Sequence, residues 1–97
     1  MPPIKFVLQL YIIGDRALSK KAITDVEKIV SEDLKDNCRL EIVDLLLNPK
    51  EAEKHNIIAT PTLIRVHPKP EKRIVGDLSN KEKLLISLDL EVLKPKQ

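Results

Sequence analysis

The sequence has few of the residues that nucleic-acid binding, phosphate binding and metal binding require. It contains one phenylalanine, one tyrosine and no tryptophan, so it offers no aromatic platform on which bases could stack. Its two glycines, Gly14 and Gly76, do not form a glycine-rich phosphate loop. Its two histidines, His55 and His67, stand apart from any cysteine or histidine cluster. We therefore expect no nucleic-acid partner, no metal ion and no other cofactor.

Cysteine and long hydrophobic runs are scarce as well. Cys38 is the single cysteine, so no internal disulfide can form, and we expect a reducing, cytoplasmic location. No apolar run approaches the ~20 residues of a membrane-spanning helix, and the start, Met1-Pro2-Pro3, lacks the form of a signal peptide. The 17 basic and 15 acidic residues are interspersed. A chain of 97 residues is long enough for one hydrophobic core, so residues 1–97 are predicted to form a single domain.

The first half of the chain predicts a strand, a helix and a second strand. Residues 4–13 are almost continuously apolar, which is typical of a central strand. Asp15 or Ser19 is the candidate N-cap of the following helix. Asp36-Asn37 is predicted to end this helix. Its predicted buried stripe consists of Ala22, Val26, Ile29, Val30 and Leu34. Residues 40–46 form the second strand, predicted to be parallel to the first because a helical crossover separates them.

The next segments predict a short helix and two further strands. Asn48 is the candidate N-cap of the short helix, with Glu51 at the capping-box position. Pro61 lacks a backbone donor and is therefore expected at the start of the strand formed by residues 63–67. Residues 72–75 are predicted to pair back antiparallel with that strand after a proline-containing turn.

The segment from Gly76 to Leu93 supports two periods. As a helix it begins at Ser79, with Glu82 at the capping-box position, and its apolar face consists of Leu84, Leu85, Leu88 and Val92. As a strand it places one set of apolar residues on a single side: Leu84, Ile86, Leu88, Leu90 and Val92. Periodicity alone leaves both interpretations open.

The order of these elements is typical of a thioredoxin-like α/β domain, β-α-β-α-β-β-α, with a four-stranded mixed sheet and helices packed on its faces. Redox chemistry in such a domain requires a low-pKa thiolate at the start of the first helix. Residues 14–19 contain no sulfur, and Cys38 lies beyond the other end of that helix, where the dipole disfavours a thiolate. We therefore predict no enzyme and no catalytic residue, and keep a redox or stress role through Cys38 as the alternative.

Two groups of charged residues are candidate binding surfaces. Lys69, Lys72 and Arg73 surround the proline turn, and Lys20 and Lys21 are candidates to extend this basic cluster. The short helix carries a mixed-charge group consisting of Lys50, Glu51, Lys54 and His55. Both patterns are also typical of an ordinary solvated surface.

Three stretches of the chain resemble the KaiB family, the small proteins of the Kai circadian oscillator and their relatives in bacteria without a known clock. They are LYIIG at 10–14, IVDLLLNPKEAEKHNIIATPTL at 42–63 and GDLSNKEKLLISLDL at 76–90. The resemblance implies a non-enzymatic regulator that binds KaiC, a hexameric ATPase, in circadian timing or stress adaptation. It also implies two folds: a thioredoxin-like monomer that binds KaiC, and a tetramer whose C-terminal half ends in a strand.

The resemblance also assigns roles to residues. It implies contacts with a KaiC-type ATPase from Lys21, Lys50, Glu51, Lys54, Lys72 and Arg73. It implies that the change of fold involves Pro61, Ser87 and Asp89. Many family members have glycine in place of Ser87, and since glycine weakens a helix interior, Ser87 is predicted to favour the helical form.

The resemblance says less about other partners. Glu41 stands near where a basic residue commonly contributes to KaiA binding in the cyanobacterial proteins, so this reversal of charge argues against a KaiA-like partner. A homo-oligomer, either dimer or tetramer, is also implied. A self-associating adaptor domain is the remaining alternative.

Overall fold

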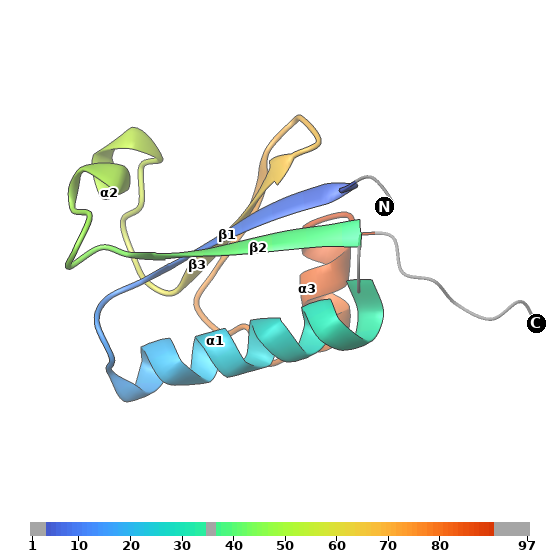
Figure 1. Ribbon diagram of the computed structural model, residues 1–97, viewed down its shortest axis with the longest axis horizontal. Helices are drawn as coiled ribbons and strands as arrows, with labels where there is room; N and C mark the ends of the chain where they lie inside the picture. The colour runs from blue at the N-terminus through green and yellow to red at the C-terminus, as the bar shows by residue number, and fades with distance from the viewer. Residues whose placement is uncertain (1–3, 35–36, 91–97) are drawn as a thin grey trace, which may run out of the picture.

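The computed structural model describes residues 4–34 and 37–90. Its elements are, in chain order, β1 (Phe6–Ile12), α1 (Ala17–Ile29), the π-helical turn η1 (Val30–Leu34), β2 (Cys38–Asp44), α2 (Lys50–Lys54), β3 (Thr62–His67), β4 (Lys72–Val75) and α3 (Lys81–Ser87). The strands form one sheet in the order β2-β1-β3-β4, with only the β1–β2 pair parallel. In Figure 1, α1 and α3 lie together on one side of the sheet, and α2 lies away from them at one end of the strands. The predicted thioredoxin-like α/β architecture is confirmed.

The hydrophobic core lies between the sheet and the layer formed by α1 and α3. Leu8 and Leu10 of β1 and Leu63 of β3 are buried in one cluster with Val26 of α1 and Leu84 of α3. Full burial of such a side chain stabilises the fold by roughly 1.5–3 kcal/mol. In the predicted stripe of the first helix, Val30 alone is only half-buried; the buried members are Ala22, Val26, Ile29 and Leu34.

The first two predicted helix caps are wrong. At the start of α1 the N-cap position belongs to Arg16. Asp15 precedes that position, and Ser19 lies inside the helix, where its Oγ donates a hydrogen bond to the carbonyl oxygen of Ile13 at 2.9 Å. At the start of α2 the N-cap is Pro49, one residue after the predicted Asn48, and no side chain among the described residues caps the helix. The predicted terminator of the first helix includes Asp36, which lies outside the described residues.

The last predicted cap is wrong by one residue. Asn80 caps α3, and its Oδ1 accepts a hydrogen bond from the backbone N–H of Lys83 at 3.0 Å. Ser79 donates its hydroxyl to Asp77 at 2.6 Å instead. Short polar side chains choose among several nearby partners, and that choice is not encoded in the spacing of a capping box.

The segment with two periods is helical from Lys81 to Ser87, so the helix interpretation is confirmed there and the strand is not adopted. The helix ends in a Schellman motif: Asp89 N–H donates to the carbonyl oxygen of Ile86 at 3.1 Å, and Leu90 N–H to that of Leu85 at 2.9 Å. Val92, expected on the same apolar face, lies outside the described residues. Ser87 is the last residue of α3 and not an interior one, so the helix-propensity argument applies to it with less force.

Asp89 occupies the left-handed position of this motif, with φ of 51°. Only glycine adopts that conformation without a steric cost, and a carboxylate at a helix C-terminus is unfavourable. We therefore expect Asp89→Gly to raise the free energy of unfolding by about 0.5–1 kcal/mol in urea titrations. Ser87→Gly serves as the comparison and is expected to lower it by a few tenths of a kcal/mol. An Asp89→Gly protein less stable than the wild type would contradict this description of the helix end.

Candidate partner-binding surface

Two groups of predicted binding residues meet where α2 approaches β4. The guanidinium Nη1 of Arg73, on β4, donates a hydrogen bond to the carbonyl oxygen of Asn56, just after α2, at 3.4 Å. Asn56 has φ of 54° and completes a second Schellman motif, in which Ile57 N–H donates to the carbonyl oxygen of Ala52 at 2.8 Å. The Schellman motif orders the end of α2, and the hydrogen bond from Arg73 joins that end to β4. We call this the α2–β4 surface; it carries Lys50, Glu51, Lys54 and Arg73. Lys72 was predicted with them, but it alternates with Arg73 along β4 and shares the opposite face of the sheet with the buried Ile74.

The charges of the α2–β4 surface are only partly compensated. Lys54 Nζ lies 3.9 Å from Glu51 Oε2, and both side chains reach solvent. Exposed ion pairs of this kind contribute little to stability. Within residues 4–34 and 37–90, neither Lys50 nor Arg73 makes an ion pair, and both are exposed. Cations without a carboxylate partner remain available for a partner protein.

Tyr11 anchors this side of the sheet. It is fully buried, and its ring lies 5.5 Å from that of His55, measured between centroids. His55, the last member of the predicted mixed-charge group, is half-buried against this ring. Burial, together with the nearby Glu51 carboxylate, raises the pKa of Tyr11 to about 12. Tyr11 is therefore neutral at physiological pH, and its ring packs against the end of α2.

A hydrogen-bonded chain continues from Tyr11 toward the sheet edge. Tyr11 Oη donates to Gln9 Oε1 at 2.6 Å, and Gln9 Nε2 donates to Glu41 Oε1 at 2.9 Å. Glu41 Oε2 also lies 3.2 Å from Nε of Arg39. Glu41, the position that argues against a KaiA-like partner, is therefore engaged within the chain on both of its oxygens.

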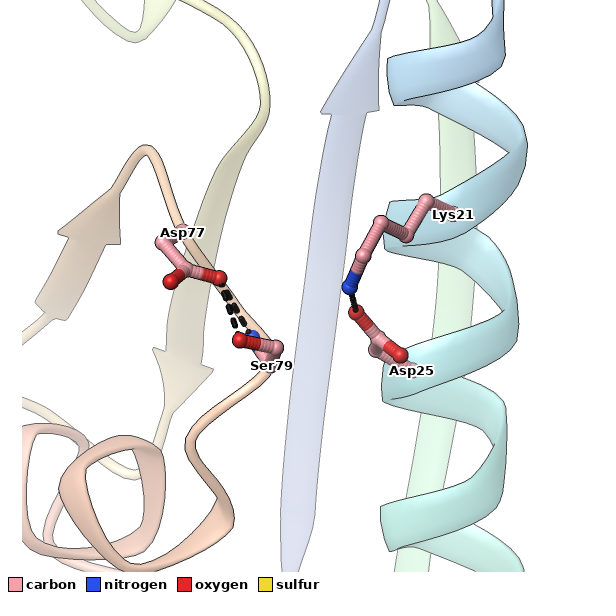
Figure 2. A network of polar contacts seen from close by, with 4 residues as sticks. All are labelled: Lys21, Asp25, Asp77 and Ser79. Carbon is pink, nitrogen blue, oxygen red and sulfur yellow. Dashed lines mark hydrogen bonds and ion pairs between the residues drawn. The ribbon is translucent and has the colours of Figure 1, made fainter.

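Lys21 lies apart from this surface. It is on α1, where its Nζ pairs with Asp25 at 2.8 Å, and this hydrogen bond raises its pKa. Figure 2 shows the pair on α1 and a second pair, Asp77 with Ser79, in the segment between β4 and α3. No contact between described residues joins Lys21 to Lys72 or Arg73. Lys21 instead lines a groove together with Pro61. A residue predicted to bind a partner and a residue predicted to take part in the change of fold therefore line the same groove.

Two structural side chains escaped the sequence prediction. Arg65 of β3 is buried and donates to the carbonyl oxygens of Leu88 and Pro70. Asp44 ends β2, and its Oδ1 accepts hydrogen bonds from the backbone N–H groups of Gly14 and Leu46, both at 2.9 Å. The sequence did contain a signal for Arg65: residues two apart on a strand share a face, so Arg65 lies on the same face as Leu63, which is buried in the core. No comparable signal in the sequence marks Asp44.

Cys38 does not lie where thiol chemistry would need it. It is the first residue of β2 and is half-buried against the core. Burial raises the pKa of its thiol to about 11, so little thiolate exists at neutral pH. This environment disfavours a redox role.

We expect the native protein to react with iodoacetamide at pH 8 about 100-fold more slowly than the urea-unfolded protein, because each pKa unit lowers the thiolate fraction about tenfold. Mass spectrometry of alkylated Cys38 over time measures both rates. Equal rates would show an accessible, reactive thiol and would restore the redox alternative.

Within the part of the chain that the structure describes, no three histidine, cysteine or acidic side chains are placed to hold a metal ion. Among the same residues, no helix is long and apolar enough to cross a membrane.

The fold and this site define a thioredoxin-like domain without a thiol at the start of its first helix. Solved structures agree on the fold: the N-terminal domain of Synechococcus elongatus SasA has a TM-score of 0.73 at 21% identity, with 94% of this chain and 90% of that chain covered. Fasciola hepatica thioredoxin has a TM-score of 0.71 at 20% identity, covering 88% and 79%. At these identities the likeness concerns the fold alone.

Sequence comparison identifies the family. The family model for the KaiB domain matches residues 9–90. Circadian clock protein KaiB3 of Synechocystis is 46% identical over 86 residues, covering 89% of this chain and 84% of that protein. Circadian clock oscillator protein KaiB of Thermosynechococcus vestitus is 45% identical over 92 residues, covering 93% and 85%. The chain belongs to the KaiB family.

Proposed function

We propose that this protein is a non-enzymatic cytoplasmic regulator that binds a KaiC-type hexameric ATPase. Membership of the KaiB family carries the proposal, because relatives that match most of this chain are named as circadian clock proteins. The regulated property is the phosphorylation or ATPase state of the partner, in circadian timing or in stress adaptation.

The proposed contact region is the α2–β4 surface. It is supported by the hydrogen bond between Arg73 and Asn56, which joins two segments that are separate in the sequence. It is also supported by the exposure of Lys50 and Arg73 without ion-pair partners among the described residues. The cations of this mixed-charge surface, Lys50, Lys54 and Arg73, suit an acidic face on the ATPase, and charge complementarity mainly raises the association rate.

Size-exclusion chromatography of this protein with its cognate KaiC-type ATPase tests the proposal. We expect co-elution with the ring after prolonged incubation in the presence of ATP or ADP. Light scattering of the protein alone, at several concentrations, reports its own oligomeric state and tests the self-associating alternative. Absence of any complex in both nucleotides after long incubation would count against the proposed function.

A further inference from the structure

The outer edge of β4 directs backbone groups away from the sheet. β4 is one of the two edge strands in the order β2-β1-β3-β4. Its ladder with β3 continues to Gly76, whose N–H donates to the carbonyl oxygen of Pro61 at 2.9 Å. Hydrogen-bonded and non-hydrogen-bonded pairs alternate along an antiparallel ladder. Ile74, two residues before Gly76, therefore bonds to β3, whereas Arg73 and Val75 direct their N–H and C=O groups outward.

These outward groups are free to pair with another chain. No hydrogen bond between residues of the described segments, 4–34 and 37–90, reaches the backbone N–H or C=O of Arg73 or Val75. Each of the two residues can exchange a pair of hydrogen bonds with an extended backbone that lies alongside, as opposed residues do in an antiparallel sheet. The edge of β4 can therefore accept one more short strand, held at these two residues.

The side chains of this edge are basic and partly apolar. Lys72 and Arg73 make no ion pair within the part of the chain that the structure describes. Glu71, the residue before the strand, has its carboxylate 4.0 Å from the ammonium of Lys69. Val75, on the same face of the sheet as Arg73, leaves 48% of its surface to solvent. The edge thus carries two uncompensated cations and one exposed apolar side chain.

These cations select what can pair with the edge. Lysine and arginine on an edge strand discourage pairing with another edge of the same kind. In a pair formed by two copies of β4, the cations of both copies would lie close together, and like charges on facing strands are destabilising. A strand with carboxylates at the matching positions gains opposite-charge pairs across the strands instead. An acidic segment is therefore the occupant that the charge pattern favours.

We propose that the outer edge of β4 binds an extended acidic segment of a partner protein as an added antiparallel strand. The residue opposite Arg73 is a glutamate or aspartate, and the residue opposite Val75 is a β-branched apolar residue on the same face. A second carboxylate, opposite Lys72, lies on the other face of the sheet. The inference goes beyond ring binding, because it requires only this strand edge and a peptide can test it without the ring.

The test uses the hexapeptide Gly-Val-Thr-Glu-Glu-Gly, acetylated and amidated, and two-dimensional NMR of the full-length protein. We expect it to shift amide resonances of residues 72–76 with a dissociation constant near ~1 mM, as for a short segment that makes few contacts. N-methylation of its valine, whose N–H faces Val75, is expected to weaken binding about 10-fold. N-methylation of its threonine, whose N–H points away from β4, is the matched control and should change binding less than about 2-fold. Replacing both glutamates with lysine is expected to weaken binding about 10-fold.

Variants of the protein locate the site. Val75→Pro removes one outward N–H and leaves the bonds to β3 in place, because proline is tolerated where a strand N–H faces solvent; it is expected to weaken binding about 10-fold. Lys72→Gln combined with Arg73→Gln is expected to abolish the preference for glutamate over lysine. Lys28→Gln combined with Lys83→Gln, which removes two exposed cations from α1 and α3, is the control and is expected to retain that preference.

Three results would overturn the proposal: the absence of shifts at about 10 mM peptide, equal weakening by the two N-methylations, or a glutamate preference that survives Lys72→Gln with Arg73→Gln. Shifts of residues 72–76 on dilution of the protein alone would assign the edge to a second copy of this chain and would likewise overturn it.

Discussion

Replacing Arg65 with methionine is expected to lower the free energy of unfolding by about 3 kcal/mol. The side chain is 4% exposed and holds three carbonyl oxygens: Nη1 donates to Leu88 at 3.0 Å and to Asp89 at 3.3 Å, and Nη2 donates to Pro70 at 2.7 Å. Hydrogen bonds from a charged donor are each worth roughly 1.5–3 kcal/mol, and the carbonyls left behind would be unsatisfied. Arg65 therefore fastens the end of α3 and the turn after β3 to the sheet.

The expected loss of about 3 kcal/mol is smaller than the sum of three such hydrogen bonds, because burying the Arg65 guanidinium also has a cost. A buried guanidinium loses its hydration, and among residues 4–34 and 37–90 the Nε of Arg65 finds no hydrogen-bond partner. Methionine would remove that desolvation cost. The helix C-terminus offsets part of it in the native protein, since the last carbonyls of a helix favour a cation. Arg65→Lys, which keeps the charge but loses the fork of donors, is expected to cost about half as much.

Urea titration measures the loss of stability, and hydrogen exchange locates it. We expect the amides of Leu84 and Leu88 to lose protection in Arg65→Met before those of β1. Arg39→Met, at a side chain that is 59% exposed, is the control and should change the unfolding free energy by less than ~0.5 kcal/mol. A fully stable Arg65→Met protein would mean that desolvation cancels the three hydrogen bonds.

Reversing two charges on the α2–β4 surface is expected to weaken binding of a KaiC-type ATPase about 30-fold. The variant is Lys54→Glu combined with Arg73→Glu, and the loss corresponds to ~2 kcal/mol. It converts cations that an acidic partner would attract into anions that it would repel. Most of the loss should come at low ionic strength, because both side chains are exposed.

A second double variant with the same net charge separates a site from a general field effect. Lys28→Glu with Lys83→Glu changes exposed residues on α1 and α3, the helices on the other side of the sheet from α2. We expect this variant to bind within about 3-fold of the wild type in interferometry at equal salt. Equal weakening by the two variants would place the contact elsewhere. Circular dichroism confirms that both remain folded.

Much of the architecture follows from the apolar pattern. Segment 4–13 is almost continuously apolar, which the central position of β1 in the sheet explains, and residues 72–75 form β4 with the predicted bounds. The helix at 81–87 required more than periodicity, because the same leucines fit a strand. Burial of Leu84 and Leu88 with the core, together with the Arg65 contacts, accompanies the helical form.

The candidate site was only partly predictable. The sequence indicated the charged residues of α2 and β4, but their meeting depends on a backbone carbonyl, that of Asn56, which no composition or spacing reports. Lys21 was expected to join the basic cluster; it pairs with Asp25 on α1 instead, because i,i+4 partners on one helix are always within reach. The roles of Pro61, Ser87 and Asp89 in a change of fold remain predictions.

Hydrogen exchange of this protein in complex with its KaiC-type ATPase tests the central claim most directly. We predict that, after prolonged incubation with the ring, the amides of residues 50–57 and 72–75 gain protection relative to the free protein, while those on the solvent face of α1 around Lys28 do not. A complex that protects only other segments would contradict the proposed surface, and the absence of a complex would contradict the proposed function itself.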